Sequence, residues 1–246
     1  MGRQWVFVVG AIGLLASAPP AAARVEVNHA FRFPEGKPVR IVVLRPDVEV
    51  GSFGAGGVEE PNADWTAAAR TRLMREIAAQ QRVSGNDIVF LPEQQGASAA
   101  LVAEYTALFA VVAGAVAEHK LKRTGRLPTK RGKFDWTLGP GAARLGALAG
   151  GEYALFVHTH DAFGSPRRKA LQLAAAGLLG VGLRAGIHHG YAGLVELRTG
   201  DLVWFNVDTA AGGDPRTDVG AIERVGQLLT GFPAAKPVLQ TAGARP

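Results

Sequence analysis

The stretch Gly151–Asp208 decides the fold of this 246-residue chain: it reads GEYALFVHTHDAF (151–163), then an apolar interruption, then GLVELRTGDLVWFNVD (193–208). In the first run, the alternate residues and most of the residues between them are apolar. This pattern is typical of a strand buried on one face and largely on the other. The second run has two apolar segments around Arg198–Asp201, a short polar loop with glycine where a positive φ is needed. This pattern predicts an antiparallel hairpin. We therefore expect a central strand from Tyr153, followed by the two strands of the hairpin.

Apolar and periodic segments elsewhere predict the remaining elements. Strands are expected at 39–44, inside the sheet, and at 87–91; helices are expected at 65–81, from Ser98 to 116, at 142–149, and from Asp214 or Thr217 to 231. The glycine-rich stretch 47–61 fits no phosphate-binding fingerprint and is expected to be a flexible surface loop. The order of these elements predicts an α/β (α+β) fold, with a mixed sheet of about five strands, packed helices and an apolar helical insertion (165–188) before the C-terminal hairpin.

Helical spacing also predicts which side of each helix is buried. The inner faces are expected to hold Ala69, Leu73 and Ile77 in the first helix, Leu101, Tyr105, Leu108, Val112 and Val116 in the second, and Val219, Ile222, Val225, Leu228 and Leu229 in the last. The second helix has Glu104 within it and many alanines, so a buried helix is favoured over a membrane span.

The two ends of the chain suggest export and a single folded domain. Residues 1–23 have Arg3, an apolar run and a small-residue end at Ala21–Ala23, as secretory signals do, so cleavage after Ala23 is expected. One α/β domain is expected over 24–233 and a disordered tail over 234–246. The expected location is the periplasm, as a soluble protein or one bound peripherally to a membrane. The sequence has no cysteine, which excludes disulfides, thiolate metal sites and a lipid-bearing cysteine.

Positive charge dominates the chain, with a formal net charge of +6. Two groups of cations stand out as candidate interaction residues, one between apolar helices and one before the insertion: Lys120, Lys122, Arg123, Arg126, Lys130, Arg131 and Lys133, and Arg167, Arg168 and Lys169. Such groups suit anionic lipid heads or cell-wall polymers as well as nucleic acid, and export makes nucleic acid an unsuitable partner. A solvated loop whose charges only confer solubility is the alternative for the first group.

A histidine cluster is the main candidate for chemistry. His158 and His160, two apart on a strand, point the same way and could share a metal, with Asp161 or His188–His189 completing the shell. A partly exposed sheet edge explains the same pair without a metal. The sequence has no HExxH or G-x-S-x-G motif, and its acids are scattered at turns and strand ends. We therefore expect no catalytic residues, no cofactor and no resident metal.

The insertion is apolar and rich in small residues. Ala170–Ile187 is interrupted only by Gln172 and Arg184 among polar side chains and contains four glycines, including Gly182-x-x-x-Gly186. A basic flank beside such a segment is typical of a helix on a bilayer surface or in close contact with another helix. Alternatively the segment folds back on the sheet as an ordinary core helix. We expect it to meet a membrane or a second subunit.

The strand Glu152–Val157 and the hairpin Leu194–Trp204 together resemble a pattern in bacterial envelope proteins, an "a-D-Y-x-L" strand before a "D-x-x-T-G-x-x-V-W" hairpin. The pattern is similar to that of curli-secretion lipoproteins, lipoprotein activators of penicillin-binding proteins and uncharacterised proteobacterial relatives. The resemblance implies a small mixed sheet with helices and a role in assembly or regulation by contact, often in oligomers. The sequence departs from the pattern at Glu152, where aspartate is frequent, and in lacking the lipidated cysteine.

These observations together predict a non-enzymatic, exported envelope protein that acts by contact. Its partner is expected to be an envelope protein or an anionic membrane surface, with self-association as a further option. The alternative is a metal-dependent hydrolase that uses His158 and His160.

Overall fold

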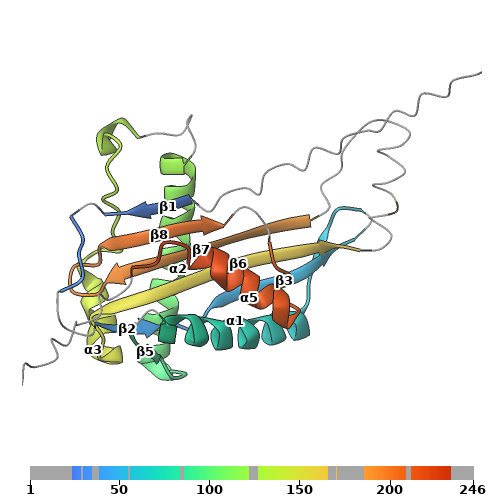
Figure 1. The fold of residues 1–246 in the computed structure, drawn as a ribbon, viewed down its shortest axis with the longest axis horizontal. Coiled ribbons are helices and arrows are strands. Elements are labelled where there is room, and N and C mark those ends of the chain that lie inside the picture. Colours follow the sequence, from blue (N-terminus) through green and yellow to red (C-terminus); the bar gives the residue numbers. More distant parts are fainter. Residues whose placement is uncertain are drawn as a thin grey trace, which may run out of the picture.

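The computed structural model describes residues 24–28, 30–34, 39–54, 56–83, 86–121, 127–165, 170, 186–208 and 212–233. They form one mixed sheet of eight strands with helices on both faces (Figure 1). The strands are β1 (Arg24–Val27), β2 (Arg40–Val43), β3 (Asp47–Phe53), β4 (Glu59–Pro61), β5 (Asp87–Phe90), β6 (Tyr153–Gly164), β7 (Gly186–Glu196) and β8 (Leu202–Asp208); the helices are α1 (Ala63–Val83), α2 (Gly96–Val116), α3 (Ala143–Ala149) and α5 (Asp218–Leu228), with short turns η1 (Ala117–Leu121), η2 (Pro128–Lys130) and η3 (Pro140–Ala142). The predicted fold class is confirmed, in a larger sheet than expected.

Strand β6 lies at the centre of the sheet, as predicted. Its whole length pairs antiparallel with β7, from Tyr153 opposite Glu196 to Phe163 opposite Gly186. Its other edge is shared by two parallel strands in succession, β2 beside the start of β6 and β3 beside its second half. The main path through the sheet is β1-β8-β7-β6-β2-β5, which places β2 inside the sheet and β5 beyond it.

The predicted hairpin is formed by β7 and β8. Its turn depends on Gly200, whose φ is +81° and whose backbone passes so close to Gly139 that a Cβ would lie 2.0 Å from the Gly139 carbonyl oxygen. Only glycine combines this φ with this approach. The turn is thereby fixed against the loop before α3, which also bridges to Asp201 through Thr137.

The prediction of a flexible loop over 47–61 was wrong. This stretch forms the β3–β4 hairpin, and all seven residues of β3 pair with β6. Val48 and Val50 are buried while Glu49 is exposed, a strand alternation that the glycines after it obscure. Strand β1, which the sequence analysis did not identify, pairs with β8 at the far edge of the sheet.

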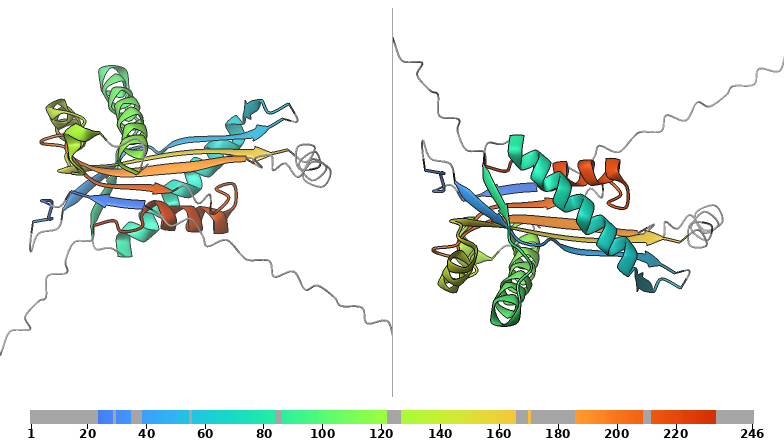
Figure 2. Two further views of the ribbon diagram at one scale, coloured as in Figure 1. Left: turned by 90° about the horizontal axis from the view of Figure 1, so that it is seen from above. Right: turned by 90° about the horizontal axis from the view of Figure 1, so that it is seen from below.

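The helices form a layer on each side of the sheet. Figure 2 shows α1 and α5 side by side on one face, whereas α2 and α3 lie on the other and α2 stands away from the sheet. α1 begins where the Asn62 side chain accepts a hydrogen bond from the Trp65 amide (2.9 Å), and Ala69, Leu73 and Ile77 are buried, as predicted. The short helix predicted at 142–149 is confirmed as α3.

Each face of the sheet has its own apolar core. The core under α1 and α5 contains Leu73, Leu155 and Trp204. The core under α2 and α3 is smaller and includes Phe109 stacked on Phe156, with ring centroids 4.9 Å apart. Together the two cores bury β6 on both sides along its first half.

Helix α5 is rotated relative to the predicted face. Thr217 caps it, as expected, by accepting a hydrogen bond from the Gly220 amide (3.1 Å). However, Val219 and Ile222 are exposed, and Arg224 is fully buried in their place. The rotation has an electrostatic cause, because it brings Arg224 onto acidic side chains of the sheet.

Helix α2 is far less buried than predicted. Its buried side chains are Tyr105, Phe109, Ala113 and Val116, whereas the expected core residues Leu101, Leu108 and Val112 are half-buried. Val111 is 70 % exposed. The helix touches the sheet along one narrow stripe, and its exposed side holds Ala100, Ala103, Glu104, Ala107 and Val111.

Three predictions lie outside the described residues: the signal at 1–23, the tail at 234–246 and nearly all of the insertion. Of the segment Ala170–Ile187, Gly186 and Ile187 belong to the start of β7.

Candidate functional site

Side chains along β6 alternate between the two faces of the sheet, and this separates polar residues that were predicted to form one cluster. His158 and His160 point to the side of the sheet that carries α2, as their shared parity predicts. Asp161 has the opposite parity, is fully buried and meets α5 on the other side. Asp161 therefore does not complete a shell with the two histidines.

The two histidines form a polar face together with residues from three other strands. We call this set the histidine face; its members are Asp47, Glu49, Glu59, His158, His160, His189 and Tyr191. Nδ1 of His158 donates to Oδ2 of Asp47 (2.9 Å), and Nε2 of His160 donates to Oε1 of Glu59 (2.7 Å). The carboxylates come from the β3–β4 hairpin, so that unexpected hairpin provides half of this face.

Imidazole rings crowd the centre of the histidine face. The ring of His189 lies 5.2 Å from that of His160 and 6.0 Å from that of His158, measured between centroids. Nδ1 of His160 also faces Oε2 of Glu49, at 3.4 Å. In the part of the chain that the structure describes, no three His, Cys, Asp or Glu side chains are grouped so as to hold a metal ion.

These contacts change two pKa values in the same direction. The hydrogen bond from His158 lowers the pKa of Asp47 below its ordinary value of 3.8. Burial lowers the pKa of His189 below 6.5, and the positive charges that His160 and His158 can carry lower it further. The histidine face therefore favours a charged Asp47 and a neutral His189.

A buried ion network lies on the opposite side of β6. Nη2 of Arg224 donates to Oδ1 of Asp161 (2.5 Å) and Nη1 donates to Oδ2 of Asp208 (3.1 Å). Nδ1 of His188 also donates to Oδ1 of Asp161 (3.0 Å). Asp161 and Arg224 are completely inaccessible to solvent, and Asp208 nearly so. A buried charge is tolerated only when paired, so the two acids require this arginine.

The sequence analysis did not identify Arg224, although a signal was present. Asp161 lies at every-second-residue spacing after Leu155, Val157 and Thr159, so its side chain is on the same, inward face of the strand. An acid at such a position of a central strand requires a cation from the covering helix. Arg224 is the arginine that lies one turn from Ala221 and Leu228 on the inner side of α5.

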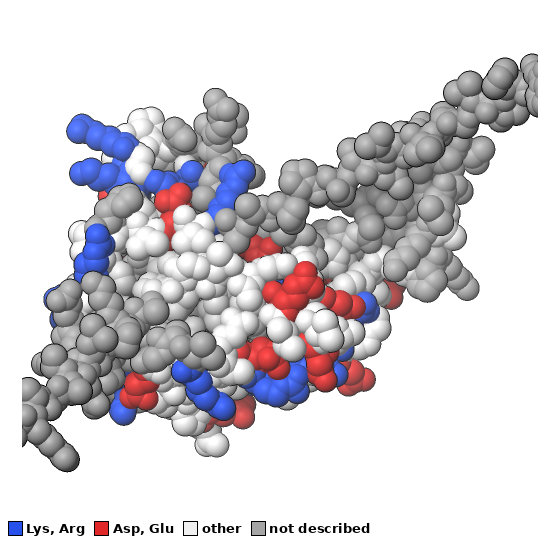
Figure 3. Space-filling model, viewed as in Figure 1, with Lys and Arg blue, Asp and Glu red and all other residues white. Residues whose placement is uncertain are grey.

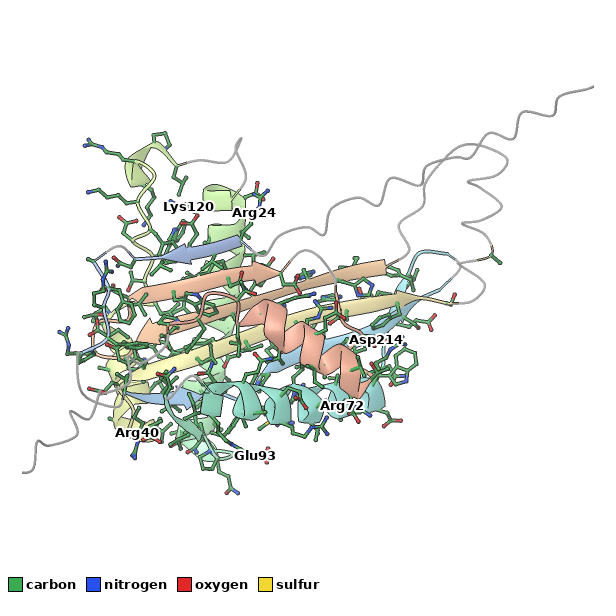
Figure 4. All side chains as sticks on the ribbon, viewed as in Figure 1. Arg24, Arg40, Arg72, Glu93, Lys120 and Asp214 are labelled. Atoms are coloured by element: carbon green, nitrogen blue, oxygen red, sulfur yellow. The ribbon has the colours of Figure 1, made fainter. Side chains whose placement is uncertain are left out.

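Three lysines of the first basic group, Lys120, Lys130 and Lys133, line a small cavity at the C-terminal end of α2. The cavity has a volume of about 310 Å³ and is lined by Glu26, His119, Lys120, Leu127, Lys130, Gly132, Lys133 and Trp136. Nζ of Lys120 donates to the carbonyl of Gly132 and lies 3.5 Å from Oε2 of Glu26 on β1, and Figure 4 shows Lys120 beside that strand. We call this the basic pocket.

Lys130 is fixed in the wall of the basic pocket. Its Nζ lies 3.1 Å from Oδ1 of Asp135 and 4.6 Å from the centroid of the Trp136 ring. Lys133 and Arg131 are exposed beside it. Figure 3 shows Lys and Arg gathered at this end of the molecule, whereas both signs of charge mix over α1 and α5. Lys122, Arg123, Arg126, Arg167, Arg168 and Lys169 lie outside the described residues.

The exposed side of α2 borders a second, larger hollow. A groove of about 820 Å³ runs between α2, the end of β5 and the β2–β3 connection, with Val102, Ala103, Thr106 and Ala107 as its helical wall. The helix itself, with its continuation to Lys120, is long and apolar enough to cross a membrane by length and composition, and 22 % of its most apolar window is buried. The groove is mixed in character, because Arg45, Asp47, Arg70 and Glu93 line it together with the apolar wall of α2.

Comparisons with known proteins give distant structural similarities. No protein-family model and no curated protein sequence matches this chain. A PelC dodecamer subunit from Paraburkholderia phytofirmans is 10 % identical, with a TM-score of 0.39 over 88 % of this chain and 99 % of that one. The lipoprotein GNA1162 from Neisseria meningitidis is 14 % identical, with a TM-score of 0.34 over 78 % and 94 %. A DUF4136-family protein from Bacteroides thetaiotaomicron is 8 % identical, with a TM-score of 0.36 over 87 % and 96 %.

Proposed function

We propose that this chain is a non-enzymatic protein of the bacterial envelope that acts by contact, and that the outer side of α2 is its contact surface. The observation that carries the proposal is the incomplete burial of α2, a helix of membrane-like composition in which Tyr105, Phe109, Ala113 and Val116 are buried and Val111 is exposed. Contiguous apolar patches on soluble monomers rarely exceed a few hundred Å² unless they bind something. A partner that covers α2 removes this exposure.

The sequence supports the location and the kind of role. The charged start, apolar run and small-residue end of residues 1–23 favour export. The strand-and-hairpin resemblance to curli-secretion lipoproteins and activators of penicillin-binding proteins favours assembly or regulation over catalysis. On the described surface, the polar groups of the histidine face are engaged with one another, as His158 is with Asp47 and His160 with Glu59.

A charge placed on the outer side of α2 tests the proposal. Val111→Glu introduces a carboxylate at a 70 % exposed position, so stability is expected to change by no more than about 0.5 kcal/mol. Association, measured as molar mass by light scattering and as flotation with vesicles, is expected to fall. Val219→Glu is the matched control, because Val219 is 77 % exposed on α5, on the opposite face. Association that responds equally to both variants, or to neither, contradicts the proposal.

The alternative function is a metal-dependent hydrolase centred on His158 and His160. The close approach of the His189 ring to both is the observation in its favour. A metal would have to displace the carboxylates that now accept hydrogen bonds from these rings, which weakens the case. Metal analysis of protein purified without chelator tests this alternative: stoichiometric zinc that is lost in His158→Ala would show the metal site that the hydrolase requires.

A further inference from the structure

A notch in the sheet produces the larger of the two hollows, the groove beside α2. β5 ends at Phe90 beside the end of β2, whereas β6 runs on to Gly164 with β3 at its side. In the described chain, no strand pairs with the other edge of β3 before β4 does so at Gly51. Pro46 and Asp47, at the start of this open edge, line the groove. The groove therefore lies outside the carboxyl ends of two parallel strands, β2 and β5.

The two walls of the groove come from opposite faces of the sheet. The chain reaches β5 from α1 and leaves it for α2, and these helices lie on different faces (Figure 2). Arg70 and Met74 of α1 line one wall, and Val102 and Thr106 of α2 line the other. In open α/β sheets, ligands bind in the crevice outside the carboxyl ends of the strands, where successive connections leave to opposite faces. The volume of about 820 Å³ lies within the range of about 300–1,000 Å³ that is usual for ligand pockets.

One cation in the groove has hydrogen-bond donors to spare. Nε of Arg70 donates to the carbonyl oxygen of Pro46 (3.1 Å), and Nη2 donates to that of Val48 (3.1 Å). These bonds fix the guanidinium against the open edge of β3, but they use only part of its set of N–H donors. Both partners are neutral, and in the part of the chain that the structure describes no carboxylate lies within ion-pair distance of Arg70.

The surroundings of Arg70 make its positive charge unfavourable. Burial lowers the pKa of Arg70, the positive charge of Arg45 lowers it further, and Asp47 opposes the shift. The two acids of the groove have other partners: Oδ2 of Asp47 accepts a hydrogen bond from Nδ1 of His158 (2.9 Å), and Oε1 of Glu93 lies 3.6 Å from Nη1 of Arg45. A bound anion would therefore compensate a cation that has no carboxylate partner among the described residues.

The lining also limits the chemistry of such an anion. Asp47 and Glu93 repel a doubly charged group such as a phosphate monoester more strongly than a singly charged one. A carboxylate carries one charge, and its two oxygens match the parallel N–H groups of a guanidinium. The remaining side chains, among them Met74, Leu91 and Val102, offer hydrocarbon rather than hydrogen-bonding groups. The groove thus combines a site for one negative charge with an apolar wall.

We propose that the groove binds a small carboxylic acid with an apolar chain, with its carboxylate on Arg70 and its chain along the wall of α2. Arg45 adds positive charge at the mouth, and Glu93, whose side chain is 85 % exposed, partly cancels it. The inference goes beyond the contact proposed for α2, because the exposed Val111 is not part of the groove lining.

Titration calorimetry of the full chain with decanoate tests the ligand class. Acetate is the matched probe without the chain and decylamine the matched probe with the opposite charge. Acetate is expected to bind at least about a hundredfold more weakly, because it lacks the methylene groups that the apolar wall would cover. Decylamine is expected to bind at least about tenfold more weakly, because it brings a second cation to Arg70. Equal binding of decylamine and decanoate would overturn recognition by the arginine.

Substitutions test the residues. Arg70→Met is expected to weaken decanoate binding by at least about tenfold, and the exposed Arg82→Met at the end of α1 is the matched control, with no change expected. Arg70 also holds two backbone carbonyls, so two exposed positions provide a test that does not depend on it. Arg45→Met should weaken binding and Glu93→Gln should strengthen it, each by about two- to fivefold. Equal effects of Arg70→Met and Arg82→Met, or shifts of Arg45→Met and Glu93→Gln in the same direction, would overturn the site.

The remaining outcomes separate the groove from the contact function of α2. Val111→Glu should leave decanoate affinity unchanged while it reduces association. A parent that binds decanoate but does not associate would retain the groove and overturn the contact function. A parent that associates through α2 but binds no decanoate would overturn the groove alone. A parent that binds no decanoate but binds, through Arg70, a peptide with an apolar C-terminal residue would overturn the small acid and assign the groove to protein termini.

Discussion

Removing Arg224 should be among the most damaging single substitutions in this fold. In Arg224→Met the methionine fills much of the arginine's volume, but Asp161 and Asp208 keep their negative charges without a cation. Both carboxylates are inaccessible or nearly so, at 0 % and 1 % exposure of the residue. Breaking a buried pair by removing one partner costs about 3–5 kcal/mol, which is a large part of the roughly 5–15 kcal/mol that stabilises a domain.

Urea denaturation followed by circular dichroism measures this loss. With a slope of about 2 kcal/mol per M, the midpoint is expected to fall by about 1.5–2.5 M at neutral pH. Arg198→Met is the control, since this arginine is 79 % exposed and its loss should cost no more than about 0.5 kcal/mol.

A second variant separates the charges from the packing. Combining Arg224→Met with Asp161→Asn and Asp208→Asn removes the whole ionic set and is expected to recover much of the loss, since Arg224 Nε and Asp161 Oδ2 have no partner even in the parent. An Arg224→Met protein as stable as the parent at neutral pH would refute the view that the arginine holds two buried charges. A triple variant no more stable than the single one would show that shape, rather than charge, dominates.

Three further predictions concern local structure and pH. Gly200→Ala should cost about 1–3 kcal/mol because it needs a positive φ against the Gly139 carbonyl, whereas Gly56→Ala, with nothing within 4 Å of the new Cβ, should be nearly neutral in thermal denaturation. Thr217→Ala removes the α5 cap and should cost about 1 kcal/mol in urea, and a loss no greater than that of the exposed Thr71→Ala would contradict the role of the cap. Burial lowers the pKa of folded His189; the positive charges of His160, His158 and Arg224 lower this pKa further, and Asp161 opposes the shift. The stability that neutral His189 contributes is therefore complete above about pH 6.5 and is lost as pH falls through the folded-state pKa. His189→Gln should flatten the dependence of stability on pH below about 6.5, and an unchanged dependence would refute the role assigned to His189.

The local elements were predictable because their determinants lie close together in the sequence. Leu73 and Ile77 mark the inner side of α1 by helical spacing alone, and Gly200 marks the β7–β8 turn. The β3–β4 hairpin was not predictable in this way, because β3 is stabilised by pairing with β6, whose sequence lies about a hundred residues later. The hydrogen bond between Asp47 and His158, for example, joins residues 111 positions apart.

The candidate sites, too, were predictable only where the residues that determine them lie close together in the sequence. Strand parity was sufficient to place His158 and His160 on one face, but their carboxylate partners belong to the hairpin that was taken for a loop. The apolar face of α5 was misplaced because periodicity counts Val219 and Ile222 as core and Arg224 as surface. Charge pairing reversed that order, since two buried acids stabilise the helix rotation that buries the arginine.

The two sides of β6 have different roles because one is sealed and the other is not. On the sealed side, Arg224 neutralises Asp161 out of contact with solvent, so this ion pair contributes to a specific orientation of α5. On the other side, His158 and His160 keep 15 % and 22 % side-chain exposure and contact carboxylates that water can reach. The histidine face shares its side of the sheet with α2, so a change in its hydrogen bonds to the β3–β4 hairpin acts on the same side of the molecule as the proposed contact surface of α2.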